Sequence, residues 1–255
     1  MRPPDPDIAG AAEREATAEA SALQARYGRL EPELVVELSV DRLFAEEIAV
    51  VSSFGAESAV LLHMISEIDR TLPVQFLDTG KHFSGTHTYR EELIDRLGLL
   101  DVRIVRPDPA LLGNFDPVGM LFSQNPDRCC HVRKVEPMAR AIAPFRAWMT
   151  GRKRYQAASR VALPVFESVG ARVRINPLAR WTAQDVDIYR AAHLLPRHPL
   201  FSAGYRSIGC QPCTRPVADG QANRDGRWAG IEKIECGIHL GGLARSLDGA
   251  LIRGL

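Results

Sequence analysis

Short apolar runs and amphipathic stretches alternate along the middle of the chain. Four short apolar runs predict buried strands, at residues 47–53, 73–77, 102–105 and 148–149. Between these runs, apolar residues recur at helical spacing in residues 57–70 and 88–97. Strands that alternate with helices predict an α/β fold, a single parallel-sheet domain with helices on both faces.

The sheet pattern divides the chain into three parts. Residues 1–44 are predicted to form an N-terminal helical appendage, because strong helix formers dominate from Ala11 onward. The first ten residues, rich in proline and aspartate, are expected to be disordered. Residues 45–220 hold the sheet domain, and residues 221–255 form a C-terminal segment that carries the last cysteine.

Composition narrows the functional classes. The chain has 255 residues and a net charge of +1, so no nucleic-acid or membrane partner is predicted, and any anion recognition must be local. No apolar run approaches the roughly 20 residues that span a bilayer, and the N-terminus lacks the layout of a signal peptide. We therefore expect a cytoplasmic protein, in which paired cysteines are metal ligands or redox groups rather than disulfides.

The loops that follow the predicted strands form the candidate pocket, because ligands of parallel sheets bind at the carboxyl ends of the strands. These loops are residues 52–58, 78–81 and 150–154. The first loop combines Gly55, which allows close backbone approach, with the hydroxyls of Ser53 and Ser58 at a helix start. This pattern suits a phosphate or sulfate group; an ordinary β–α turn with a serine cap is the competing interpretation.

Five cysteines divide into two close pairs and one isolated residue. Cys129 and Cys130 are adjacent in a predicted helical turn, and Cys210 and Cys213 share a CxxC turn. Four thiolates are typical of a structural zinc ion or of an iron–sulfur cluster. Adjacent residues of a helix point about 100° apart, which favours a centre larger than one ion. Unrelated thiols or a regulatory disulfide would also account for the spacing.

Cys236 stands alone and is followed by Gly237, and cations precede it at Arg224, Arg227 and Lys233. Neighbouring cations stabilise a thiolate, so this pattern predicts a nucleophile that attacks an anionic electrophile. An inert buried cysteine is the competing interpretation. The polar, glycine-containing surroundings favour an exposed thiol, on a segment that swings between a pocket and solvent.

Taken together, these motifs resemble the iron–sulfur branch of the sulfonucleotide reductase family, the assimilatory adenylyl-sulfate (APS) reductases. The matching blocks are residues 53–58, 77–81, 129–134, 150–152, 176–178, 204–215, 226–228 and 235–239. The first block resembles the PP-loop of the adenine-nucleotide α-hydrolases, with Phe54 in place of a glycine and Glu57 in place of an aspartate. Residues 1–44 and the tail after Leu240 carry none of these motifs.

The resemblance implies a PP-loop type of sheet domain, a C-terminal catalytic tail and a thiol-based reduction. In such enzymes APS becomes sulfite and AMP through an S-sulfocysteine, with thioredoxin or glutaredoxin as reductant. The positions that match the ligands of a [4Fe–4S] cluster, expected to order the active site, are Cys129, Cys130, Cys210 and Cys213; Cys236 matches the nucleophile. The positions that match substrate-binding motifs are Ser53, Gly55, Glu57, Ser58, Leu77, Gly80, Lys134, Gly151, Arg152, Arg224, Arg227 and His239.

Three further functions stay open. A PAPS reductase acts on the 3′-phosphorylated nucleotide, but such relatives commonly lack the two cysteine pairs. An ATP-dependent PP-loop thiolase acting on tRNA would need the glycine-rich loop that Phe54 interrupts. A zinc-stabilised nucleotide-binding protein would leave the Cys236 motif without a role. The oligomeric state is open, a homo-oligomer included.

Overall fold

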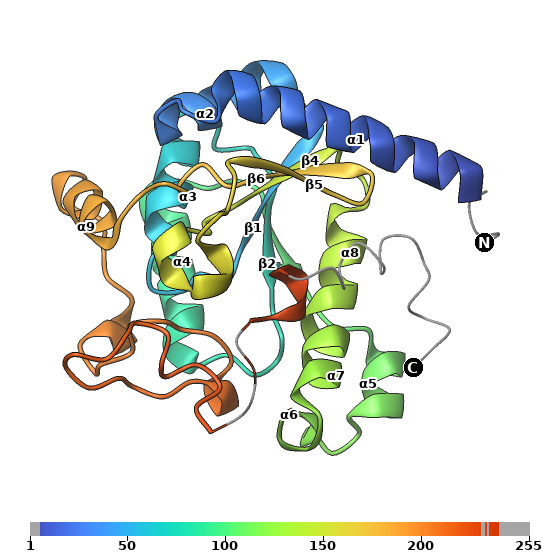
Figure 1. Cartoon of the computed structure of the whole chain (residues 1–255). Helices are drawn as coiled ribbons and strands as arrows, with labels where there is room; N and C mark the ends of the chain where they lie inside the picture. Colours follow the sequence, from blue (N-terminus) through green and yellow to red (C-terminus); the bar gives the residue numbers. More distant parts are fainter. Residues whose placement is uncertain (1–5, 231–232, 234, 240–255) are drawn as a thin grey trace.

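The computed structural model describes residues 6–230, 233 and 235–239, and a six-stranded sheet lies at the centre of this part (Figure 1). The strands are β1 (Ile48–Ser52), β2 (Val74–Leu77), β3 (Val102–Val105), β4 (Ala147–Thr150), β5 (Phe166–Val169) and β6 (Arg172–Ile175). Their order is β3-β2-β1-β4-β6-β5, and every neighbouring pair is parallel except β5 with β6. The predicted parallel α/β sheet is confirmed, with one antiparallel edge strand added.

The hairpin of β5 and β6 has no counterpart in the prediction. β2 and β4 are buried along their whole length and are mostly apolar, with Gln75 and Thr150 as buried polar exceptions. The hairpin strands instead mix charged and apolar residues. For example, Glu167 on β5 lies opposite Arg174 on β6. The sequence marks the hairpin only through Gly170, which adopts a φ of 56° in the turn.

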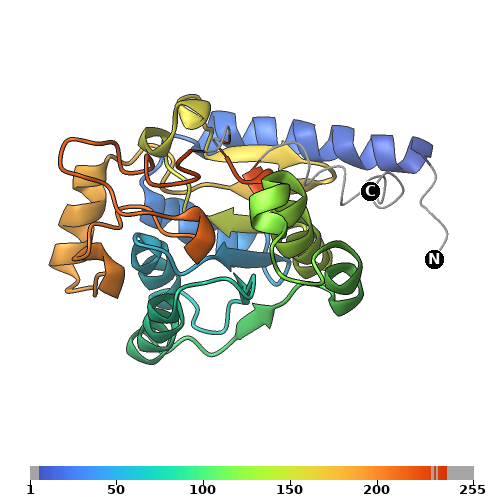
Figure 2. The same cartoon turned by 90° about the horizontal axis from the view of Figure 1, so that it is seen from below.

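Helices cover both faces of the sheet, as Figures 1 and 2 show. On one face lie α3 (Ser58–Ser66), α4 (Ser84–Leu97) and α9 (Ala183–Ala192), and on the other lies α8 (Glu136–Ile142). The larger core, on the α3 side, includes Phe44, Val50, Ile65, Phe76 and Leu93. The smaller core, on the α8 side, includes Leu77, Met138, Ile142 and Trp148.

The N-terminal appendage consists of α1 (Pro6–Tyr27), α2 (Pro32–Leu38) and the π-helical turn η1 (Ser39–Leu43). Helix α1 runs along β5 and β6, and Gln24 Oε1 accepts hydrogen bonds from the backbone N–H groups of Val165 and Phe166 at 2.9 and 3.0 Å. Residues 6–10 are helical, although their composition predicts disorder; residues 1–5 lie outside the described part. The appendage thus covers the hairpin edge.

Short elements carry the chain around the carboxyl ends of the strands. Between β3 and α8 these are α5 (Pro109–Phe115), α6 (Leu121–Gln124), α7 (Pro126–Cys130) and the π-helical turn η2 (His131–Val135). After β4 come η3 (Arg154–Gln156) and η4 (Ala158–Arg160), and after α9 come η5 (Pro199–Phe201), η6 (Gln211–Cys213) and η7 (Gly237–His239). In the described ranges, no helix combines the length and the apolar character needed to cross a bilayer.

Candidate active site

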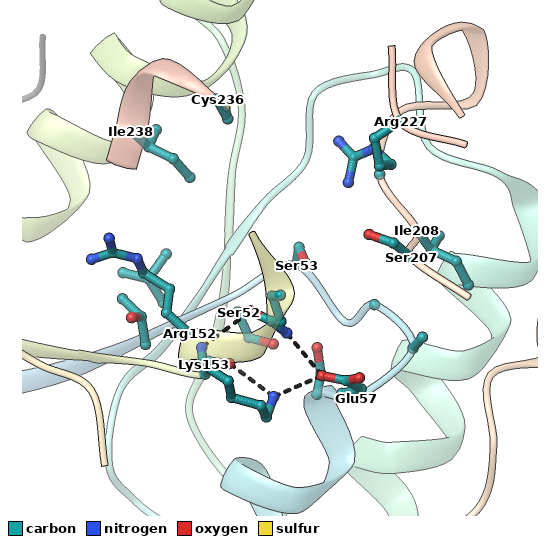
Figure 3. Close-up of a pocket in the computed structure, with 18 of the residues that line it drawn as sticks. Ser52, Ser53, Glu57, Arg152, Lys153, Ser207, Ile208, Arg227, Cys236 and Ile238 are labelled. Atoms are coloured by element: carbon teal, nitrogen blue, oxygen red, sulfur yellow. Dashed lines mark hydrogen bonds and ion pairs between the residues drawn. The ribbon is translucent and has the colours of Figure 1, made fainter. Parts of the chain in front are cut away.

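A cavity of about 210 Å³ opens at the carboxyl ends of β1, β2 and β4 (Figure 3). Most of the residues that the sequence assigns to a site line it: Ser53, Gly55, Glu57, Ser58, Leu77, Lys134, Gly151, Arg152, Arg224, Arg227 and Cys236. Gly80 is not among the described residues that line it. His239 ends η7, and its side chain lies outside the described part.

The β1–α3 loop is held by Phe54, the residue that stands where the PP-loop has a glycine. Its φ is 47°, a left-handed conformation that favours glycine, yet its ring is fully buried and packs edge-on against Phe76 with 5.5 Å between ring centroids. Ser52 Oγ accepts a hydrogen bond from the Phe54 N–H at 3.1 Å. Core packing therefore compensates for the unfavourable backbone, and the loop keeps its turn without the glycine.

Gly55 brings a second segment close to this loop. A Cβ on Gly55 would stand 3.3 Å from the carbonyl oxygen of Ile208, so the chain that leads to the CxxC turn approaches the loop backbone directly. This contact closes one wall of the cavity.

Glu57 belongs to a network of protein donors rather than to free anion-binding surface. Its carboxylate accepts from Lys153 Nζ at 2.9 Å (Figure 3). It also accepts from the Tyr155 hydroxyl at 2.6 Å and from Gln156 Nε2 at 2.8 Å. Burial acts to raise the pKa of Glu57, but the charge of Lys153 and these hydrogen bonds outweigh it and hold the pKa below its usual value. Glu57 therefore fixes the loop after β4.

Cys236 lies in van der Waals contact with Cys130 and Trp228, and only 5% of it is exposed. The prediction from its polar sequence surroundings that the Cys236 thiol is exposed is therefore wrong. A hydrogen bond from Cys130 lowers the pKa of Cys236 well below its usual value; burial opposes this, and the charges of Lys134 and Arg227 add to it. Within this pocket Cys236 is the thiol best placed to act as a nucleophile.

Lys134 connects the nucleophile to the paired cysteines. Burial acts to lower its pKa, but the negative charges of the neighbouring Cys210 and Cys236 thiolates raise the pKa well above its ordinary value. Arg227, which is half-buried, lies over the Trp228 ring with 4.5 Å from guanidinium to ring centroid. Two persistent cations therefore line the cavity next to Cys236.

The two cysteine pairs line a second, smaller cavity beside the first one. Cys129, Cys130 and Cys210 are buried, and Cys213 is half-buried. Burial raises the pKa of Cys129 to about 11 and also raises that of Cys213, so thiolates are unfavourable there unless a positive centre compensates them. This chemistry fits a cationic metal centre held by the four sulfurs.

The four cysteines of the second cavity are its candidate metal ligands. Within the described ranges, no three His, Cys, Asp or Glu side chains are grouped closely enough to hold a single metal ion. Four thiols around one cavity offer the donor set of a metal centre.

The loop that contains Gly80 supports the cysteine cavity instead of the larger pocket. The Thr79 hydroxyl lies 3.3 Å from Cys210 Sγ, and the carbonyl oxygen of Lys81 accepts from the Gln211 N–H at 2.7 Å. Gly80 itself has a φ of 68° and lies next to Arg133. The sequence places this loop at the correct edge of the sheet but not at the correct cavity.

Four charged residues that line the pocket are absent from the predicted site residues: Lys153, Arg160, Arg206 and Glu235. Lys153 is almost fully buried and lines the pocket. It directly follows the matching block 150–152, which ends one residue before it. Arg160, on η4, carries no recognisable sequence pattern. Glu235 stands beside Cys236, and its side chain is 3% exposed. These last two are paired with each other in three dimensions.

The amino-acid sequence is similar to those of known reductases. Residues 47–216 match the family model of the phosphoadenosine phosphosulfate reductase domain. A protein of Mesorhizobium japonicum named adenosine 5′-phosphosulfate reductase is 58% identical over 244 residues, which cover 96% of each chain. A protein of Gloeobacter violaceus named phosphoadenosine 5′-phosphosulfate reductase is 39% identical, over 85% of this chain and 92% of the relative.

Solved structures show the same fold. The phosphate complex of phosphoadenylyl-sulfate (PAPS) reductase from Candida auris superposes with a TM-score of 0.64 and 27% identity, covering 78% of this chain and 96% of that one. FMN adenylyltransferase from Candida glabrata, in complex with FMN and an ATP analogue, superposes with a TM-score of 0.51 at 15% identity, covering 87% of this chain and 86% of that one. The latter likeness concerns the fold alone.

Proposed function

Because the chain belongs to the phosphoadenosine phosphosulfate reductase family, we propose that it reduces adenosine 5′-phosphosulfate (APS) to sulfite and AMP in sulfate assimilation. The 58% identity to a protein named adenosine 5′-phosphosulfate reductase supports APS as the substrate. The relative named for the 3′-phosphorylated nucleotide is 39% identical, which makes PAPS the second candidate.

The position of Cys236 carries this proposal. Its thiol lies in the wall of a cation-lined cavity, with Lys134 and Arg227 close enough to lower its pKa. The same cations would neutralise an anionic sulfonucleotide as it approaches, so nucleophile and electrophile can meet without charge repulsion.

In the first stage the Cys236 thiolate attacks the sulfur of the sulfuryl group. A bond forms between the two sulfur atoms, the bond from sulfur to the bridging phosphate oxygen breaks, and AMP leaves with that electron pair. AMP needs no proton to leave, because its phosphate is a weak base. The enzyme is left with an S-sulfocysteine at position 236.

In the second stage a reduced dithiol protein of the thioredoxin or glutaredoxin type attacks Sγ of Cys236. Sulfite leaves with the electrons of the sulfur–sulfur bond, and a mixed disulfide forms between the two proteins. The second thiol of the reductant then displaces Cys236 as a free thiol. Both electrons come from the dithiol, so no other group needs to change its oxidation state.

A [4Fe–4S] cluster is part of the proposal, with Cys129, Cys130, Cys210 and Cys213 as its ligands. Their position around one cavity supports it. When bound, the cluster would tie the turn that carries Lys134 to the CxxC turn and so order this wall of the pocket. We propose the cytoplasm as the location, because paired cysteines in a reducing compartment are typically metal ligands rather than disulfides.

Sulfite release tests the function. The wild-type protein, supplied with APS and reduced thioredoxin, is expected to release sulfite and AMP in equal amounts and to turn over PAPS more slowly. Without reductant, mass spectrometry should find one sulfo group on the peptide that contains Cys236. A Cys236→Ser variant that released sulfite at the wild-type rate would exclude the mechanism, and faster turnover of PAPS would reverse the substrate assignment.

A further inference from the structure

Glu235, the residue before the nucleophile, is a buried carboxylate held by two arginines. Its Oε2 accepts from Arg160 Nε at 2.8 Å, and its Oε1 accepts from Arg224 Nη2 at 3.0 Å. Oε1 also accepts from the backbone N–H of Cys236 at 3.2 Å. The side chain is 3% exposed, so both ion pairs are largely removed from water.

The two arginines belong to fixed parts of the pocket wall. Arg160 lies on η4, and its Nη1 donates to Gln156 Oε1 at 2.6 Å; Gln156 in turn donates to Glu57. Arg224 lies over the Trp228 ring at 5.8 Å. Glu235 therefore connects the backbone of the nucleophile to the same network that holds the β1–α3 loop.

The contacts that the remaining described residues of 233–239 make are weaker or less directional. Lys233, whose side chain is 6% exposed, is paired with Asp127, but the Asp127 side chain is 85% exposed, so water screens this pair more than the pairs of Glu235. Ile238 packs against the smaller core, and its carbonyl oxygen accepts from Arg174 Nη1 at 3.3 Å. Among these described residues, Glu235 makes the most buried ionic contact.

The proposed reaction makes two opposite demands on this segment. In the first stage Cys236 must face the cation-lined cavity, where it now lies 5% exposed. In the second stage a protein thiol must reach its Sγ in line with the bond that breaks, which a buried sulfur does not permit. The segment must therefore dock and release in every cycle.

We propose that Glu235 is the positioning residue that docks the Cys236 segment, by pairing with Arg160 and Arg224, and that rupture of these pairs opens Cys236 to the reductant. This inference rests on the proposed function. A buried ion pair suits this task because its geometry is specific. When the segment opens, the charged groups regain their hydration, so the net free energy that keeps the segment closed is only a small part of the attraction between the charges. An apolar contact of the same area would have no such compensation.

Alkylation of Cys236 by iodoacetamide tests the proposal without any substrate. The protein is used with its native metal content, and modification of the Cys236 peptide is followed by mass spectrometry. Rates are compared on the high-pH plateau, where the thiol is fully ionised, so that a changed thiol pKa does not affect the comparison. The Glu235→Gln variant is expected to react at least about tenfold faster than wild type. Its neutral side chain cannot form the charged hydrogen bonds to the two arginines, so less free energy opposes opening of the segment.

Asp187→Asn is the matched control. Asp187, on α9, also lies between two arginines, Arg190 and Arg197, at 3.5 and 2.7 Å, but it is exposed and does not line the cavity. Its alkylation rate should equal that of wild type. Glu235→Asp, which keeps the charge on a shorter side chain, should fall between wild type and Glu235→Gln. Equal plateau rates for wild type and both Glu235 variants would overturn the proposal.

Single-turnover kinetics separate positioning from general damage. Glu235→Gln should form the S-sulfocysteine more slowly, while thioredoxin should discharge the preformed intermediate at least as fast as in wild type. Slowing of both stages would indicate a distorted pocket and count against docking. If wild type failed to reduce APS at all, the proposed function would fall, whereas the alkylation result would still report on the docking contact.

Discussion

The guanidinium group of Arg227 lies directly over Gly209: a Cβ at position 209 would stand 2.4 Å from Arg227 Nη2. The Nε atom of Arg227 is buried, and within the described part it has no hydrogen-bond partner. The position of the side chain is therefore set by packing between Gly209 and the Trp228 ring. The cation is left available for an anionic ligand in the cavity.

Replacing Gly209 with alanine should displace Arg227 and weaken substrate binding. The clashing atoms are the end of a flexible side chain, so the free energy of unfolding should change by less than about 1 kcal/mol. The KM for APS should rise about tenfold or more, since a charged hydrogen bond is lost or misdirected. Steady-state kinetics and urea unfolding measure the two effects.

Gly113→Ala provides the control for this substitution. Gly113 lies in α5, and a Cβ there would meet nothing within 4 Å. Its KM should remain that of wild type. An unchanged KM in Gly209→Ala as well would show that Arg227 does not contact the substrate.

The ion pair between Glu57 and Lys153 should contribute to stability as a coupled unit. Lys153 is 1% exposed and lies 2.9 Å from the Glu57 carboxylate. Glu57→Gln leaves a buried ammonium without its counter-ion, so we expect a loss of about 3 kcal/mol in the free energy of unfolding. Glu57→Gln combined with Lys153→Met should lose less than the sum of the two single variants, by at least about 1 kcal/mol. Additive losses in urea unfolding would contradict this coupling.

His198 should make stability depend on pH. It is 1% exposed, its Nδ1 accepts from the Leu200 N–H, and burial lowers its pKa from 6.5 to about 4. Because the folded-state pKa lies below the unfolded value, the stabilising contribution is complete above pH 6.5. It is lost as the pH falls toward 4, by about 3 kcal/mol in total.

His198→Asn retains an acceptor but does not titrate in this range. Its free energy of unfolding should therefore fall less than that of wild type between pH 6.5 and 4, when both are measured by urea unfolding at several pH values. Parallel pH profiles for the two proteins would show that another group is responsible.

Metal content should distinguish the paired cysteines from Cys236. Anaerobically purified wild type is expected to contain about four irons and four sulfides per chain, with broad absorption at about 400 nm. Cys213→Ser should lose most of the iron, whereas Cys236→Ser should keep it and lose only activity. Zinc without sulfide in the wild-type protein would exclude the cluster.

Patterns that span a few residues were enough to predict the central part of this protein. The strands β1, β2 and β4 are mostly apolar because both faces of the parallel sheet are buried there, and consecutive residues of the sequence reflect this. The chemistry of the paired cysteines, the serine–glycine loop and Cys236 follows from residue type and short spacing. The resemblance to a family then supplied their roles.

What only the tertiary structure decided are the contacts between distant segments. Local sequence patterns do not predict three such contacts: the hairpin β5–β6, the pairing of Glu235 with Arg160, and the contact of Cys236 with Cys130. Whether a thiol is buried or a glycine faces a cavity depends on what packs against it. Local sequence specifies which groups are present; the free energy of burying and pairing them depends on neighbours that only the folded chain supplies.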